Sequence, residues 1–105
     1  MQFTSFLQGG NLTVALTGEI DHHCAKGYIQ AIAAKIEAYT PVLCILDFTD
    51  VTFIDSSGVA VVINALRETK RIDAKLLLTG VGDQPRKVFR AAGIDKIIEM
   101  KEVLL

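Results

Sequence analysis

The sequence predicts a single α/β domain with a mixed β-sheet, an opening hairpin and three main helices. Short apolar runs alternate with longer segments whose apolar residues recur every three to four positions, a pattern typical of strands joined by helical crossovers. Two strands precede the first helix and are separated only by Gln8-Gly9-Gly10-Asn11, a segment that suits a tight turn. The expected order is β-β-α-β-α-β-α-β, in one domain over residues 1–105.

Composition and charge argue against several classes of function. Half of the residues are hydrophobic, the formal net charge is −1, and 105 residues suffice for one core. This charge gives no basis for binding nucleic acid, and no apolar run approaches the roughly 20 residues of a membrane span. Cys24 and Cys44 form no CxxC pair, and Met1 to Gln8 lacks the pattern of a signal peptide. We therefore expect a cytoplasmic protein with reduced thiols and no nucleic-acid or membrane partner.

The first part of the chain predicts a hairpin followed by a helix. Phe3 to Leu7 is the first strand, and the alternating segment Leu12 to Leu16 is the second, which we expect to end at Gly18. Asp21 is a suitable N-cap for a helix that runs to about Tyr39. The residues expected on the buried face of this helix are Ala25, Tyr28, Ile29, Ile32, Ala33 and Ile36.

The stretch from Val42 to Leu66 is the one around which the chain is organised. It opens with the apolar run Val42 to Leu46, which has the length and β-branched character of a strand buried on both faces. A polar break at Asp47 to Asp50 and a short apolar return from Val51 to Ile54 follow. The chain then passes through Asp55-Ser56-Ser57-Gly58 into an amphipathic helix. The residues expected on its buried stripe are Val59, Val62, Ile63 and Leu66.

The last third predicts a strand, a helix and a final strand. Leu76-Leu77-Leu78 reads as another strand buried on both faces. Asp83-Gln84-Pro85 opens a helix with proline in its first turn, and Gly93 is expected to follow its end in the left-handed conformation. Lys96 to Met100 is the predicted last strand, and Val103 to Leu105 a tail.

Two polar loops are expected at the same edge of the sheet, because sites in parallel sheets gather beyond the carboxyl ends of the strands. These loops are Thr17 to His23 and Asp47 to Gly58, and both hold acidic and hydroxyl residues. The simpler interpretation is that Asp55, Ser56 and Ser57 only cap a helix. The alternative is that one hydroxyl is a phosphate acceptor or a nucleophile.

A serine hydrolase is poorly supported, because it needs a general base and an oxyanion site. Only half of the nucleophile-elbow pattern surrounds Ser56, since Gly58 follows it but Ile54 stands at the position of the first glycine. His22 and His23 are adjacent at a predicted helix start, where consecutive side chains diverge by about 100°. At most one of them could face the serine.

Metal, phosphotransfer and nucleotide sites are also poorly supported. Consecutive residues from Asp21 to Cys24 do not converge on one ion at a helix start. A receiver-type domain phosphorylated on Asp55 would need a lysine at the end of a later strand, whereas Lys75 begins one. Gly80-Val81-Gly82 is too short for a dinucleotide fingerprint. We expect no catalytic residue, no metal and no cofactor, which leaves a hydroxyl at a helix N-terminus, where a phosphate is stabilised.

Three segments of the chain together resemble the STAS domain family. They are Leu16 to His23 (LTGEIDHH), Leu46 to Gly58 (LDF through FIDSSG) and Val88 to Ile94 (VFRAAGI), in the family's order and over most of the chain. Within the family the chain is most similar to the free-standing anti-sigma factor antagonists, especially the sporulation antagonist of endospore-forming bacteria. The resemblance implies one STAS-type domain without enzyme activity.

The resemblance also implies a phosphoserine switch. In the family, the first serine of the DSSG segment is phosphorylated by an anti-sigma factor that is also a serine kinase, and here that serine is Ser56. The unphosphorylated antagonist binds the anti-sigma factor and frees the sigma factor, the phosphorylated form does not bind, and a serine phosphatase resets it. Asp21, Asp55, Ser56, Ser57 and Gly58 are then expected on the partner-facing rim of a domain that is monomeric when free.

A second interpretation stays open within the family, because STAS domains also serve as scaffold or accessory modules in stress-signalling and transport complexes. The acceptor serine and the single domain favour the switch. Cys24 follows the histidine pair where a hydroxyl residue is expected, and the tail after Met100 is short. Neither departure touches the phosphoacceptor.

Overall fold

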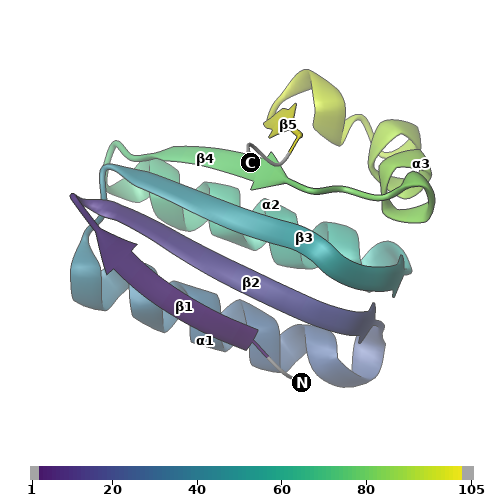
Figure 1. Ribbon diagram of the computed structural model, residues 1–105, viewed down its shortest axis with the longest axis horizontal. Coiled ribbons are helices and arrows are strands. Elements are labelled where there is room, and N and C mark those ends of the chain that lie inside the picture. The colour runs from purple at the N-terminus through teal and green to yellow at the C-terminus, as the bar shows by residue number, and fades with distance from the viewer. Residues whose placement is uncertain (1–2, 103–105) are drawn as a thin grey trace.

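The computed structural model describes residues 3–102, in which a five-stranded sheet is packed against helices (Figure 1). The predicted order of strands and helices is confirmed, with one short 3₁₀ helix added before the last strand. That addition delays the last strand relative to the predicted Lys96 to Met100, and the predicted tail, Val103 to Leu105, lies outside the described residues. The elements are β1 (Phe3–Gln8), β2 (Asn11–Ile20), α1 (His22–Tyr39), β3 (Leu43–Ile54), α2 (Ser56–Arg71), β4 (Lys75–Thr79), α3 (Asp83–Ala91), η1 (Ile94–Lys96) and β5 (Glu99–Lys101).

The strands lie across the sheet in their sequence order, β1-β2-β3-β4-β5. β1 is antiparallel to β2, and the other neighbours are parallel. Right-handed crossovers that step in one direction along a sheet place their helices on the same side. α1 and α2 accordingly lie side by side on one face of the sheet, and Figure 1 shows α3 beyond the end of β4.

This one-sided covering shows that the prediction of strands buried on both faces is wrong. Along β3, Cys44 and Leu46 are buried, whereas Ile45 between them is only half-buried because it points to the open face. β4 behaves in the same way, with Leu77 half-buried. Val42 lies before β3 and is 67% exposed. An apolar residue on an open sheet face looks the same in the sequence as one that is covered.

Both central strands are also longer than predicted. β2 does not end at Gly18, which has φ +76°, but continues to Ile20. β3 shows no break at Asp47 to Asp50 and continues to Ile54. Two register shifts between these strands each insert one extra residue in β3, and such bulges accommodate the polar segment within the strand. The shifted pairing brings Ile20 opposite Ile54 at the carboxyl ends of the two strands.

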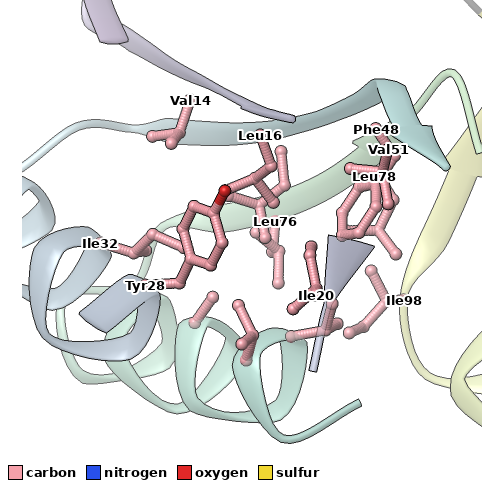
Figure 2. Packing of buried hydrophobic residues seen from close by; sticks show 14 of the residues in the cluster. Val14, Leu16, Ile20, Tyr28, Ile32, Phe48, Val51, Leu76, Leu78 and Ile98 are labelled. Atoms are coloured by element: carbon pink, nitrogen blue, oxygen red, sulfur yellow. The ribbon is translucent and has the colours of Figure 1, made fainter. Parts of the chain in front are cut away.

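The core fills the space between the sheet and the helices (Figure 2). The ring of Tyr28 reaches from α1 toward β2, and its hydroxyl donates a hydrogen bond to the carbonyl oxygen of Thr17 at 3.2 Å. Phe48 of β3 and Phe89 of α3 meet edge to face with ring centroids 5.5 Å apart, which fixes α3 to the sheet. Burial raises the pKa of the Cys44 thiol to about 12, as expected for a cysteine that acts as a small hydrophobic residue.

The helices begin and end close to the predicted positions, but the buried face of α2 differs. Asp21 caps α1, Tyr39 ends it, and Gly93 follows α3 in the left-handed conformation with φ +78°. In α2, most of the predicted stripe is only partly buried and flanks the true core face. The reason is that apolar residues surround most of the first two turns, so the pattern alone does not fix the rotation of the helix. The residues of α2 that are buried are Gly58, Val61, Val62, Ala65 and Thr69.

Candidate functional site

The carboxyl edge of the sheet brings the two predicted polar loops together. Ile20 at the end of β2 pairs with Ile54 at the end of β3, and the backbone N–H of Asp55 donates to the carbonyl oxygen of Ile20 at 3.3 Å. Each strand then passes directly into a helix, through Asp21 into α1 and through Asp55 into α2. The first turns of α1 and α2 are therefore neighbours at this edge.

Asp21 and Asp55 cap their helices in the same way. Oδ1 of Asp21 accepts a hydrogen bond from the backbone N–H of His23 at 2.9 Å, and Oδ1 of Asp55 accepts one from Ser57 at 2.7 Å. Partial loss of water raises the pKa of the Asp21 carboxyl, but the hydrogen bond and the nearby imidazole of His23 outweigh it and lower this pKa below its usual value. The capping interpretation is therefore correct for the two aspartates.

The two serines do not take part in capping through their hydroxyls. Ser56 is the first residue of α2 and is exposed, and within residues 3–102 its hydroxyl makes no hydrogen bond. Ser57 contributes only its backbone N–H, in the bond to Asp55. The hydroxyl of Ser56 thus lies where the helix dipole and free N–H groups stabilise added negative charge.

Gly58 is required by close packing rather than by an unusual backbone conformation. It is buried, and a Cβ atom at this position would lie 2.7 Å from the Cβ atom of Ile54. Real structures do not tolerate such a distance without a shift of one partner. The first turn of α2 consequently packs directly against Ile54, the last residue of β3. This contact fixes the position of Ser56.

Gln84 also belongs to this edge, and the sequence analysis assigned it no role there. Its Oε1 accepts a hydrogen bond from the backbone N–H of Ile54, and its Nε2 donates one to the Ile54 carbonyl oxygen, both at 2.9 Å. A glutamine in the first turn of a helix is usually solvated, and a backbone partner leaves no mark in the side-chain pattern. The start of α3 is thereby joined to the same strand end as the start of α2.

A solvent-open groove runs from Ser56 between α2 and α3. Its surface is mostly apolar, with one cation on its wall, and it explains why Val59 is only partly buried. A partner that covers Ser56 can reach these apolar side chains at the same time. The residues that line the groove are Ser56, Val59, Lys87, Val88, Ala91 and Ala92.

The histidines beside this edge are not hydrogen-bonded to either serine. His22 and His23 are exposed, their ring centroids are 3.9 Å apart, and neither forms a hydrogen bond with Ser56 or Ser57. Residues 3–102 hold no cluster of three metal-ligating side chains, and no helix in that range is long and apolar enough to cross a membrane. Within the described residues, no hydrogen bond joins the hydroxyl of Ser56 to a basic side chain.

Comparison with known proteins finds relatives along nearly the whole chain. Residues 7–104 match the model of the STAS domain. The anti-sigma-B factor antagonist of Listeria monocytogenes is 27% identical over 93 residues, which cover 89% of this chain and 81% of that protein. The anti-sigma F factor antagonist of Lysinibacillus sphaericus is 31% identical over 83 residues, covering 79% of this chain and 71% of that protein.

The fold matches solved structures of the anti-sigma factor antagonist SpoIIAA. The unphosphorylated form has a TM-score of 0.85 and 26% identity, covering 98% of this chain and 89% of that chain. The phosphorylated form, from Bacillus, has a TM-score of 0.77 and 26% identity, covering 98% of this chain and 92% of that chain. The mixed sheet with its opening hairpin and three helices is therefore a known arrangement. Because the family model covers almost all of its residues, this chain belongs to the STAS domain family, as its LTGEIDHH and DSSG segments predict.

Proposed function

We propose that this protein is an anti-sigma factor antagonist whose binding is switched by phosphorylation of Ser56. The observation that carries the proposal is the state of the Ser56 hydroxyl, which is exposed and makes no hydrogen bond within the described residues at the start of α2. The names of the two bacterial relatives support the antagonist role, and SpoIIAA has been solved both with and without its phosphate. In this role the protein works in the cytoplasm, where sigma factors act.

In the unphosphorylated state, the anti-sigma factor covers Ser56, the neighbouring caps and the groove between α2 and α3. The apolar side chains Val59 and Val88 supply area that is removed from water on binding. Burying a neutral hydroxyl at the rim costs little free energy when the partner supplies one hydrogen bond to it. The anti-sigma factor is thereby held away from its sigma factor.

Phosphorylation changes this surface without unfolding the domain. A phosphate adds about −1.5 to −2 charges at pH 7. The N-terminus of α2 stabilises that charge, while the carboxylate of Asp55 beside it repels it, so the two effects on folding oppose each other. At a packed interface the same charge must be desolvated, which costs several kcal/mol. Binding is therefore lost while the fold is kept.

The partners supply the chemistry in this scheme. The anti-sigma factor acts as a serine kinase: the Oγ of Ser56 attacks the γ-phosphorus of ATP, ADP leaves, and the hydroxyl proton passes to a base of the kinase. A serine phosphatase returns the hydroxyl by hydrolysis of the phosphate ester. The domain itself contributes the acceptor and its position, and no catalytic group.

The test is to incubate the protein with ATP and its anti-sigma factor and to map the phosphate by peptide mass spectrometry. We expect one phosphate on Ser56, phosphorylation of Ser57→Ala, and none of Ser56→Ala. Thr49 serves as the internal control, because its hydroxyl already donates to Oδ1 of Asp47 at 2.6 Å. A phosphate mainly on Ser57 or Thr49 would overturn the residue assignment. A bound anti-sigma factor that transfers no phosphate would overturn the switch.

A further inference from the structure

We propose that Gln84 is a positioning residue that joins α3 to the first turn of α2, which carries Ser56. A charge introduced at Ser56 then displaces the start of α3 as well as that of α2. The role of this coupling in regulating a partner rests on the function proposed above. The coupling itself rests on geometry at the end of β3, and it is testable in the free protein.

The end of β3 has an edge that no strand among residues 3–102 pairs. The pairing of β3 with β4 ends at Asp47 and Thr79, whereas β3 continues to Ile54. The backbone groups of successive residues in a strand point to alternate sides. Because the N–H of Asp55 points toward β2, both backbone groups of Ile54 point to the opposite side, where β4 has already ended.

The side-chain amide of Gln84 occupies this open edge in place of a further strand. It accepts from the N–H and donates to the C=O of Ile54, in two partly buried bonds of 2.9 Å. Such backbone groups are costly to leave unpaired away from water. The side-chain amides of Gln and Asn carry a donor and an acceptor on the same carbon, as the pairing with one residue's N–H and C=O needs, and Asn is one methylene shorter. Glutamine is therefore the side chain that fits this position.

Ile54 links this amide to the phosphoacceptor by two short routes. Its side chain packs so closely on Gly58 that no Cβ atom fits between them, and its carbonyl begins the peptide that leads through Asp55 to Ser56. A negative charge at Ser56 repels the Asp55 carboxylate and attracts the first N–H groups of α2. Any resulting shift of this turn displaces the Ile54 peptide and, through Gln84, the start of α3.

The coupling matters because α2 and α3 are the two walls of one groove. Val59 lies on the α2 wall, and Lys87 and Val88 lie on the α3 wall, with Ser56 between them at the end. With Gln84 in place, a partner meets both walls in a fixed relative position. Phosphorylation then acts on the whole groove rather than on one side chain.

The test compares amide resonances in ¹H–¹⁵N spectra of the full chain with and without Ser56→Asp, whose carboxylate stands in for the phosphate. We expect this substitution to shift amides in the first turn of α2 and in residues 86–91 of α3. In a Gln84→Met background, the shifts in α2 should persist, whereas those in α3 should fall by about twofold or more. Hydrogen exchange at the Ile54 N–H should also become faster in Gln84→Met.

Gln30→Met is the matched control, because Gln30 is exposed on α1 and makes no side-chain hydrogen bond within the described residues. It should leave the α3 shifts and the exchange rate unchanged. Should Gln84→Met not fold, Gln84→Asn replaces it, with the same expected loss because the shorter amide cannot reach both groups. The proposal is overturned if Ser56→Asp leaves α3 unmoved, or moves it equally with and without Gln84. No partner enters this experiment, so its outcome is independent of whether Ser56 is phosphorylated.

Discussion

The first turns of α1 and α2 are capped alike but continue differently. Both follow the end of a paired strand, and both are capped by an aspartate that accepts from the second helical N–H. α1 continues with His22-His23-Cys24, whereas α2 continues with Ser56-Ser57-Gly58. At the third position of α1 the thiol of Cys24 reaches the carbonyl oxygen of Glu19 at 3.4 Å, whereas α2 has a glycine pressed against Ile54.

The comparison distinguishes the feature that a helix needs in order to begin, the aspartate cap, from features that only α2 has. An aspartate cap is sufficient to begin α1, and the same cap is present in α2. Three features of α2 are additional to the cap: a Ser56 hydroxyl that no described residue bonds, the close contact at Gly58 and the amide of Gln84 on Ile54. These additional features hold the Ser56 hydroxyl at a defined place on the surface, where we propose that it is phosphorylated.

The largest effect on folding is expected at the third helical position. Gly58→Ala should lower the free energy of unfolding by about 1–3 kcal/mol, because the added Cβ would lie 2.7 Å from that of Ile54, which Gln84 holds in place. Cys24→Ala at the matching position of α1 should cost less than about 1 kcal/mol. Urea melts of both variants measure the difference. Equal losses at the two positions would mean that the contact at Gly58 is not tight.

The two aspartate caps should contribute similar amounts to the free energy of unfolding. Asp21→Ala and Asp55→Ala should each lower the free energy of unfolding by about 1 kcal/mol, because each removes one bond to an N–H of the first turn. Urea melts under identical conditions test this equality. A much smaller loss for Asp55→Ala would show that Ser56 or Ser57 can replace it as the cap. It would contradict the claim that the serine hydroxyls have no part in capping.

A smaller effect distinguishes Asp21 by its response to pH. The pKa of its carboxyl in the folded protein lies below the ordinary value for an aspartate, so the ionised form is more stable in the folded than in the unfolded chain. The stability that results is present above the unfolded pKa and is lost as the pH falls through the folded pKa. In urea melts at a series of acidic pH values, Asp21→Asn should keep the cap but lose less stability on acidification than the wild type. A parallel decline of both proteins would contradict the lowered pKa.

Features that depend on neighbours in the chain could be predicted from the sequence. Asp21 and Asp55 stand just before apolar helical patterns, and Gly93 stands just after one, so their roles follow from local rules. The DSSG and LTGEIDHH segments predicted the family, which the comparisons confirm. The partner-facing role of Asp21, Asp55, Ser56, Ser57 and Gly58 stays a prediction, although the pairing of the two strand ends places them at one edge.

Features that depend on the sheet as a whole could not be predicted in this way. The order of the strands decides that α1 and α2 share one face, and only then are Ile45 and Leu77 half-exposed. The rotation of α2 is set by its packing on α1 and the sheet, which leaves Val59 beside α3. Gln84 was missed for the same reason, because its partner is a backbone 30 residues away.

The most direct test of the central claim compares Ser56→Ala and Ser56→Asp in binding and in stability. The account holds that Ser56 serves the partner and not the fold, so both variants should unfold within about 1 kcal/mol of the wild type. In a titration against the anti-sigma factor, Ser56→Ala should bind as the unphosphorylated protein does. Ser56→Asp should bind more than about a hundredfold more weakly, a loss of about 3 kcal/mol. Equal affinities of the two variants, or a Ser56→Asp variant that does not fold, would contradict the account.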